Sequence, residues 1–229
     1  MKPRYFTIPN LLTLGNLLCG SLAAYYAFAV GDLRTVFWLV VIAAVLDFFD
    51  GFAARMLNSF SPIGKELDSL ADMVSFGLVP AASLFRLYVL ADGTQPFGFI
   101  IFIVTLFSAL RLAKFNIDEN QTEEFIGLNT PANTLLITSF AYIYSDGILP
   151  VSPEWLIAGA VVLAVMLIVP VRMFSLKFKN FSFRDNALRY IFLAFAFASL
   201  ALFGVAAVPV VMTMYIIVSL VRDLFSPKS

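Results

Sequence analysis

The sequence predicts an all-α, polytopic membrane helix bundle with eight transmembrane helices. Its 229 residues are 61% hydrophobic and only 13% charged, whereas a soluble domain has about 45–50% apolar and about 25% charged residues. The mean hydropathy is +0.91, and several apolar runs approach the roughly 20 helical residues that cross a bilayer core. Lipid is therefore the expected solvent for most of the chain, which we interpret as one integral-membrane domain spanning residues 1–229.

The predicted spans follow from the apolar runs between polar, glycine and proline breaks. The first run begins after a short basic N-terminus, and because polar residues interrupt it, we expect a retained helix rather than a signal peptide. The last two runs are separated by a turn that we place at Gly204, near Pro209; merging them would leave seven spans. The eight segments are 10–30, 35–56, 67–90, 96–114, 130–145, 153–172, 186–203 and 205–221.

The basic residues indicate the orientation of these spans. With eight spans and a cytoplasmic N-terminus, only Arg34 and Arg86 of the fifteen basic residues lie near the outer side. Cytoplasmic loops carry the Lys/Arg excess, so we expect both termini and the loop 57–66 to be cytoplasmic in a cell-membrane protein. The thirteen cytoplasmic positions are Lys2, Arg4, Arg55, Lys65, Arg111, Lys114, Arg172, Lys177, Lys179, Arg184, Arg189, Arg222 and Lys228.

Composition also narrows the possible functions. The sequence contains no basic tail or arm, so a nucleic-acid partner is not expected. The single cysteine, Cys19, cannot form a disulfide within the chain. The chain has no histidine, which makes a zinc or iron site unexpected.

Four carboxylates occupy positions at which lipid would penalise them. Asp47 and Asp50 lie in the second apolar run at i,i+3, and Asp68 and Asp72 open the third run at i,i+4, so each pair shares one helix face. The loop 57–66 joins these two helices as antiparallel neighbours, so both pairs are expected to converge near the cytoplasmic end. Intramembrane acids are costly and normally face a functional cavity.

Converging carboxylates require compensation for their mutual repulsion. Divalent cations with oxygen ligands, Mg²⁺ or Mn²⁺, supply it, and two such ions suit a displacement at phosphorus. Arg55, one turn past Gly51, adds a cation for a phosphate. The alternative is a network of ion pairs with Arg55 and Lys65, which would leave at least two acids uncompensated.

The region 47–72 resembles the signature of the CDP-alcohol phosphotransferase family. Asp-Phe-Phe-Asp-Gly-Phe-Ala-Ala-Arg covers 47–55, Gly64 follows, and Asp-Ser-Leu-Ala-Asp covers 68–72. The resemblance implies a homodimer with two divalent ions, in which the acids are metal ligands and one of them is also the general base. The implied metal ligands are Asp47, Asp50, Asp68 and Asp72, the base is Asp72, and the CDP pocket is shaped by Gly51, Ala54, Arg55 and Gly64.

The N-terminal segment 8–16 resembles the part of family members that faces the nucleotide. Asn10 is a candidate ligand there, but it can equally face lipid headgroups on a helix that Pro9 begins. For Thr13 and Asn16 we expect the headgroup orientation.

Three further segments, 69–80, 111–116 and 125–132, resemble the phosphatidylserine synthase branch of the family. Asn129 stands where the branch pattern has a proline. The branch resemblance implies transfer of the phosphatidyl group from CDP-diacylglycerol to the hydroxyl of L-serine, which yields phosphatidylserine and CMP. Arg111 and Lys114 are candidate partners of the serine carboxylate or ordinary positive-inside anchors. The expected acceptor-binding residues are Ser75, Arg111, Lys114, Asn116 and Asn129.

Other functions fit parts of the pattern. A phosphatidylglycerophosphate synthase, which uses glycerol 3-phosphate, or another CDP-alcohol phosphotransferase would share the acidic signature. A cation-coupled transporter would also place acids in the membrane, but transporter sites usually lie near the midplane between repeated halves. Here the acids cluster towards one end and the motif occurs once.

Overall fold

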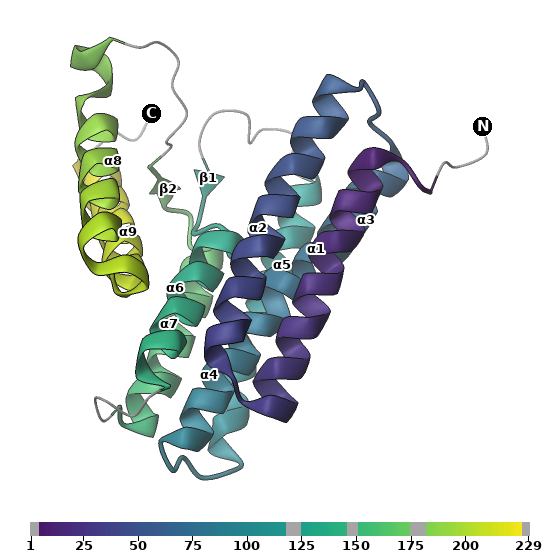
Figure 1. The fold of residues 1–229 in the computed structure, drawn as a ribbon. Coiled ribbons are helices and arrows are strands. Elements are labelled where there is room, and N and C mark those ends of the chain that lie inside the picture. Colours follow the sequence, from purple (N-terminus) through teal and green to yellow (C-terminus); the bar gives the residue numbers. More distant parts are fainter. Residues whose placement is uncertain (1–4, 118–124, 146–150, 175–181, 226–229) are drawn as a thin grey trace.

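The computed structural model describes residues 5–117, 125–145, 151–174 and 182–225. They form a bundle of long antiparallel helices with a separate helical hairpin beside it (Figure 1), which confirms the all-α prediction. The acidic stretch 118–124 and most of the basic stretch 174–184 lie outside the described residues. The helices are α1 (Ile8–Tyr25), η1 (Tyr26–Val30), α2 (Leu33–Met56), α3 (Pro62–Asp72), η2 (Met73–Leu78), α4 (Val79–Leu90), η3 (Phe97–Phe102), α5 (Ile103–Ile117), α6 (Thr130–Tyr144), α7 (Pro153–Ile168), α8 (Phe183–Phe203), η4 (Gly204–Ala206) and α9 (Ala207–Phe225).

Five helical stretches in the described residues are long and apolar enough to cross a membrane. α6 has 15 residues and α7 has 16, so both are shorter than a usual span, and α8 with α9 forms one continuous apolar stretch of 40 residues. The polytopic membrane class is therefore confirmed, while the number eight stays a prediction. The five stretches are Ile8–Val30, Leu33–Met56, Pro62–Leu90, Phe97–Ile117 and Asn186–Phe225.

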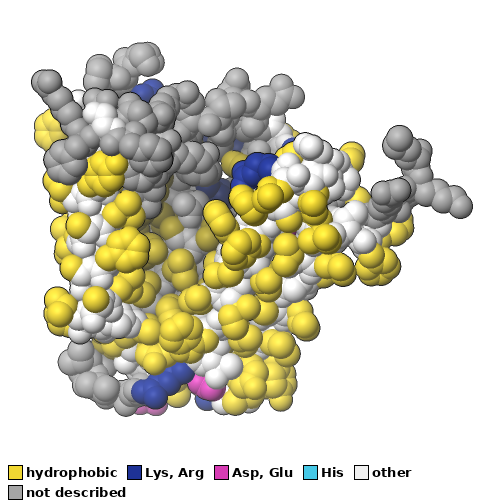
Figure 2. Space-filling view, turned by 45° about the horizontal axis from the view of Figure 1, so that its top comes forward, with side chains coloured by type: hydrophobic (Ala, Val, Ile, Leu, Met, Phe, Trp, Pro, Cys, Tyr) yellow, Lys and Arg dark blue, Asp and Glu magenta, His cyan; other side chains and the backbone are white. Residues whose placement is uncertain are grey.

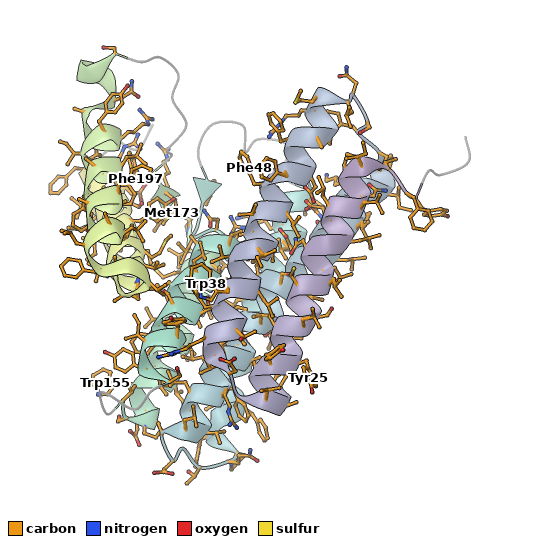
Figure 3. The ribbon with its side chains drawn as sticks, in the orientation of Figure 1. Tyr25, Trp38, Phe48, Trp155, Met173 and Phe197 are labelled. Atoms are coloured by element: carbon orange, nitrogen blue, oxygen red, sulfur yellow. The ribbon has the colours of Figure 1, made fainter. Side chains whose placement is uncertain are left out.

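The outer surface of the bundle is apolar. In Figure 2 hydrophobic side chains cover most of the visible face, and charged side chains gather towards its two ends. Trp155 is 76% exposed and Phe197 is 70% exposed, and both project away from the helices in Figure 3. Such a surface is stable in lipid and would be an aggregation liability in water.

The antiparallel order brings the start of α1 and the end of α9 to the same end of the molecule (Figure 1). Among the described residues, most basic side chains belong to this same end, and only Arg34 and Arg86 belong to the opposite end. The basic residues at the end that holds both termini are Arg55, Lys65, Arg111, Lys114, Arg172, Arg189 and Arg222.

Several boundaries shift by a few residues from the sequence predictions, and two of these shifts have a local cause. α3 begins at Pro62, because Ser61 caps it by accepting a hydrogen bond from the Gly64 backbone at 3.0 Å, so the predicted loop 57–66 is shorter. The predicted helix 153–172 ends at Ile168, before Pro170, and Arg172–Met173 (β2) pairs antiparallel with Phe125–Ile126 (β1). These short strands were not predicted, because their partner lies about fifty residues away.

The predicted turn at Gly204 is present. Gly204 has φ +56 and ψ −135, a backbone conformation that favours glycine, and α8 and α9 lie side by side in Figure 1. Phe192 on α8 contacts Tyr215 on α9 with ring centroids 6.1 Å apart. The apolar stretch from 186 to 225 is thus a helical hairpin rather than one tilted helix.

Candidate active site

Three of the four predicted acids meet where α2 packs near α3. Asp47 and Asp50 come from α2 and Asp68 from α3, and each offers a carboxylate oxygen within 4.8 Å of those of the other two. Asp50 is buried, and Asp47 and Asp68 are half-buried. The i,i+3 spacing predicted this convergence, because it places both α2 acids on the face turned to α3.

Asp72 lies one helical turn beyond Asp68, at the end of α3, and outside this group of three carboxylates. Its Oδ1 accepts a hydrogen bond from Asn16 Nδ2 at 3.2 Å. The α1 helix therefore orients Asp72 separately from the three acids.

The polar face of α1 turns towards the acids, which makes our expectation for Thr13 and Asn16 wrong. Thr13 is 3% exposed and donates to Asp50 Oδ2 at 2.6 Å, and Asn16 is fully buried. The signal that could have identified them is the spacing of Asn10, Thr13 and Asn16 at i,i+3,i+6. That spacing puts three polar side chains on one face of an otherwise apolar helix.

The acid cluster fits a divalent cation. Asp68 Oδ1 is buried and has no hydrogen-bond partner among the described residues, which is costly for a carboxylate oxygen unless a cation binds it. Lys65, which the alternative interpretation pairs with the acids, donates instead to the Asn116 carbonyl at 2.8 Å. Hard oxygen ligands from half-buried carboxylates are the donor set that Mg²⁺ and Mn²⁺ prefer.

A cavity of about 320 Å³ adjoins the cluster between α1, α2 and α3. Apart from its chain neighbours and its own helix backbone, no heavy atom of the described residues lies within 4 Å of the position that a Gly51 Cβ would take, so that face of α2 is open to a ligand. A Cβ on Gly64 would lie 3.1 Å from Asn10 Oδ1 and would crowd this wall. Arg55 is exposed on the last turn of α2, outside the cavity lining. The cavity is lined by Pro9, Asn10, Thr13, Asp50, Gly51, Ala54, Ser59, Phe60, Ser61, Gly64, Lys65 and Asp68.

The two predicted acceptor cations differ in their surroundings. Arg111 on α5 is 8% exposed, and its Nε has no hydrogen-bond partner in the part of the chain that the structure describes. Its charge is attracted electrostatically to Asp72. Lys114 is exposed one turn later. Both line a small pocket together with Ile126 and Leu167. A buried guanidinium that interacts electrostatically with a candidate base is a suitable partner for an anionic group of a substrate.

The remaining predicted acceptor residues already have partners within the protein. Ser75 donates to the Asn16 carbonyl at 3.1 Å, and Asn116 Nδ2 donates to Ser69 Oγ at 2.7 Å. Asn129 caps α6, because its side chain accepts a hydrogen bond from the Ala132 backbone at 2.7 Å. Their contacts join α1 to η2, join α5 to α3 and begin α6, and their role as acceptor ligands stays a prediction.

Comparison with known proteins identifies the family. The sequence pattern described as CDP-alcohol phosphatidyltransferase matches residues 6–175, which include the acid cluster, the cavity and Arg111. The chain belongs to the CDP-alcohol phosphatidyltransferase family. The match ends before α8, so the α8–α9 hairpin lies beyond the part that this family pattern describes.

Individual family members extend the similarity. A Helicobacter pylori (strain J99) protein is 31% identical over 234 residues, which cover 98% of this chain and 94% of the relative. A Bacillus subtilis protein is 40% identical over 139 residues, covering 59% of this chain and 76% of the relative, and a Methanocaldococcus jannaschii protein is 34% identical over 143 residues, covering 62% and 64%. Each of these three relatives is named CDP-diacylglycerol–serine O-phosphatidyltransferase.

Proposed function

We propose that this chain is a CDP-diacylglycerol–serine O-phosphatidyltransferase, which makes phosphatidylserine and CMP from CDP-diacylglycerol and L-serine. The observation that carries the proposal is an acid cluster beside a cavity, in a chain that aligns over nearly its whole length with a relative named for this reaction. The whole chain, residues 1–229, acts as one catalytic domain, and 47–72 supplies its metal and donor site.

The residues that would hold two divalent cations, Mg²⁺ or Mn²⁺, are Asp47, Asp50, Asp68 and Asp72. Bound cations of this kind neutralise the pyrophosphate of a donor and stabilise the oxygens that enter and leave phosphorus. Two observations support this assignment: the Asp68 oxygen that has no partner among the described residues, and the proximity of the three carboxylates. Without such compensation the acids would repel one another strongly at membrane depth.

The donor lipid binds with its nucleotide in the cavity between α1, α2 and α3, where Asn10, Gly51, Ala54 and Gly64 form the walls. Arg55 approaches its phosphates from the end of α2. Next to the acids, α2 also carries Phe48, Phe49 and Phe52, which are 63%, 47% and 44% exposed, and Phe48 projects outward from α2 in Figure 3. Acyl chains can remain in lipid against this aromatic surface.

Asp72 accepts the proton of the serine hydroxyl, with its carboxylate oriented by Asn16. The serine oxygen then attacks the phosphorus that bears diacylglycerol, the bond from that phosphorus to the CMP oxygen breaks, and CMP leaves. Arg111 binds the serine carboxylate near Asp72. Positioning and charge stabilisation supply most of the rate enhancement in such displacements.

The protein resides in the cell membrane as a homodimer, with its active site open to the cytoplasm. The basic residues at the end that holds both termini support this orientation. Serine and CMP exchange with the cytoplasm, and the two lipids stay in the membrane.

The acceptor is tested by measuring CMP release from CDP-diacylglycerol by purified protein with one alcohol at a time. We expect release with L-serine in the presence of Mg²⁺ or Mn²⁺, and background release with glycerol 3-phosphate. Release with glycerol 3-phosphate but not with serine would identify a phosphatidylglycerophosphate synthase. Absence of release with every alcohol would refute the enzyme proposal.

Arg111→Ala should raise the KM for serine about ten- to a hundredfold, because a lost charge-assisted hydrogen bond costs about 1.5–3 kcal/mol. The KM for CDP-diacylglycerol should remain within about threefold of the wild-type value. Lys114→Ala is the comparison, and its smaller rise is expected because Lys114 is exposed. An unchanged serine KM in both variants would indicate that these two residues do not bind serine and serve only as positive-inside anchors.

A further inference from the structure

The helix that carries Asp72 changes its geometry directly after that residue. Met73–Leu78 (η2) is a π-helix, in which the Val79 backbone donates to the Val74 carbonyl five residues back. Pro80 accounts for the irregularity, because it has no N–H for the Phe76 carbonyl four residues earlier and its ring clashes with that carbonyl in a regular α-helix. Single π-turns in α-helices occur frequently at functional sites.

Two threonine hydroxyls from other helices satisfy carbonyls of this π-turn. Thr134 Oγ1 on α6 donates to the Phe76 carbonyl at 2.9 Å, and Thr105 Oγ1 on α5 donates to the Gly77 carbonyl at 3.1 Å. Thr134 and Phe76 are both fully buried. The hydroxyl of Thr134 therefore replaces the donor that Pro80 cannot provide.

The π-turn is also coupled to the carboxylate of Asp72 through α1. Ser75 Oγ donates to the Asn16 carbonyl at 3.1 Å, and Asn16 Nδ2 donates to Asp72 Oδ1 at 3.2 Å. The close approach requires Gly20, because a Cβ there would lie 2.2 Å from Ser75 Oγ and 2.8 Å from Ser75 Cα. A shift of the π-turn would move Ser75, and with it the residue that orients Asp72.

We propose that Thr134, assisted by Thr105, is a positioning residue for Asp72. By holding the Phe76 carbonyl, Thr134 keeps the π-turn in the conformation in which Ser75 and Asn16 aim the carboxylate at the acceptor hydroxyl. This inference rests on the proposed function, in which Asp72 is the general base. Thr134 touches neither substrate nor metal in this role, so its loss should affect turnover rather than binding.

Thr134 also has a local partner, because its Oγ1 lies 2.8 Å from the Thr130 carbonyl of its own helix. Threonine hydroxyls in helices often bond back in this way. Thr138, one turn later and fully buried, donates only to the Thr134 carbonyl, at 2.7 Å, among the described contacts. Thr138→Val therefore makes the same chemical change on the same helix, at a hydroxyl that does not bond the π-turn, which makes it a matched control.

The experiment compares Thr134→Val, Thr134→Ser and Thr138→Val in full-length protein, using whichever alcohol supports CMP release by the wild type. Thr134→Val should lower kcat about tenfold, because the base is displaced rather than removed, with both KM values within about twofold of wild type. Thr134→Ser, which restores the hydroxyl, should recover at least about half of the wild-type kcat. Thr138→Val should retain the wild-type kcat. Rates are normalised to folded protein, measured by thermal unfolding in detergent.

If Thr134→Val impairs folding, Thr105→Val provides a second variant. It should lower kcat without changing the KM values. The inference is overturned if Thr134→Val and Thr138→Val have equal kcat, or if Thr134→Ser is as slow as Thr134→Val. A rise in KM at unchanged kcat would also overturn it. Wild-type inactivity with every alcohol would instead remove the proposed function, and this inference with it.

Discussion

Asp68→Asn should lower CMP release to below about one-thousandth of the wild-type rate while the protein remains folded. Asp68 supplies a buried carboxylate oxygen, without a hydrogen-bond partner in the described ranges, to a group whose oxygens lie within 4.8 Å of one another. Asparagine keeps the shape of the side chain but removes the charge that a divalent cation needs. The measurement is CMP release in detergent over a range of Mg²⁺ and Mn²⁺ concentrations.

Thermal unfolding separates a lost metal site from a lost fold. Cation binding to the folded state should raise the melting temperature of the wild type and should have little effect on Asp68→Asn. In EDTA the variant should be at least as stable as the wild type, since one of the repelling carboxylates is gone. Asp92→Asn makes the same chemical change at an exposed site and should leave activity intact. Full wild-type activity in excess EDTA would contradict the assignment of a metal site.

Asp72→Asn should lower kcat at least roughly a hundredfold, because a positioned general base contributes about 10²–10⁴-fold. The asparagine can still accept the hydrogen bond from Asn16, so the local structure should persist. The KM for CDP-diacylglycerol should stay within about threefold of the wild-type value, since the cavity between α1, α2 and α3 is not lined by this residue. Steady-state kinetics with each substrate varied in turn provide the measurement.

The size of the effect discriminates between roles for Asp72. A fall of less than about tenfold would place the proton acceptor elsewhere in the site. A large rise in the donor KM with little change in kcat would indicate that Asp72 mainly binds the donor, directly or through a cation.

The membrane class, the helix order and the convergence of three acids follow from local rules that act along the sequence. Apolar runs of span length identify helices, because a helix satisfies every backbone hydrogen bond within its own segment in lipid. The i,i+3 pair Asp47 and Asp50 must share a face, and a short loop must return the chain so that Asp68 approaches them. α8 ends just before Gly204, because glycine adopts the positive φ of this turn without steric cost, and this end was predictable from the sequence.

The roles of single polar side chains depended on tertiary packing. Thr13 and Asn16 were expected to face headgroups, yet they contact Asp50 and Asp72, because α1 packs with its polar face inward. Periodicity shows which residues share a face of a helix, but the neighbour of that face is a long-range property. The same reason explains why β1 and β2 were missed, since their partners are distant in the sequence.

The sequence alone predicted a cluster of acids at membrane depth, since an acid in lipid is costly and its helical spacing is local. Only the tertiary structure decided which polar side chains contact these acids and the π-turn beside Asp72. Pro80 in the sequence indicates an irregular turn. The hydroxyls that donate to this turn belong to Thr105 and Thr134, on helices that follow it in the chain. A hydrogen bond between distant residues forms when packing brings its atoms together, so no local pattern reveals it.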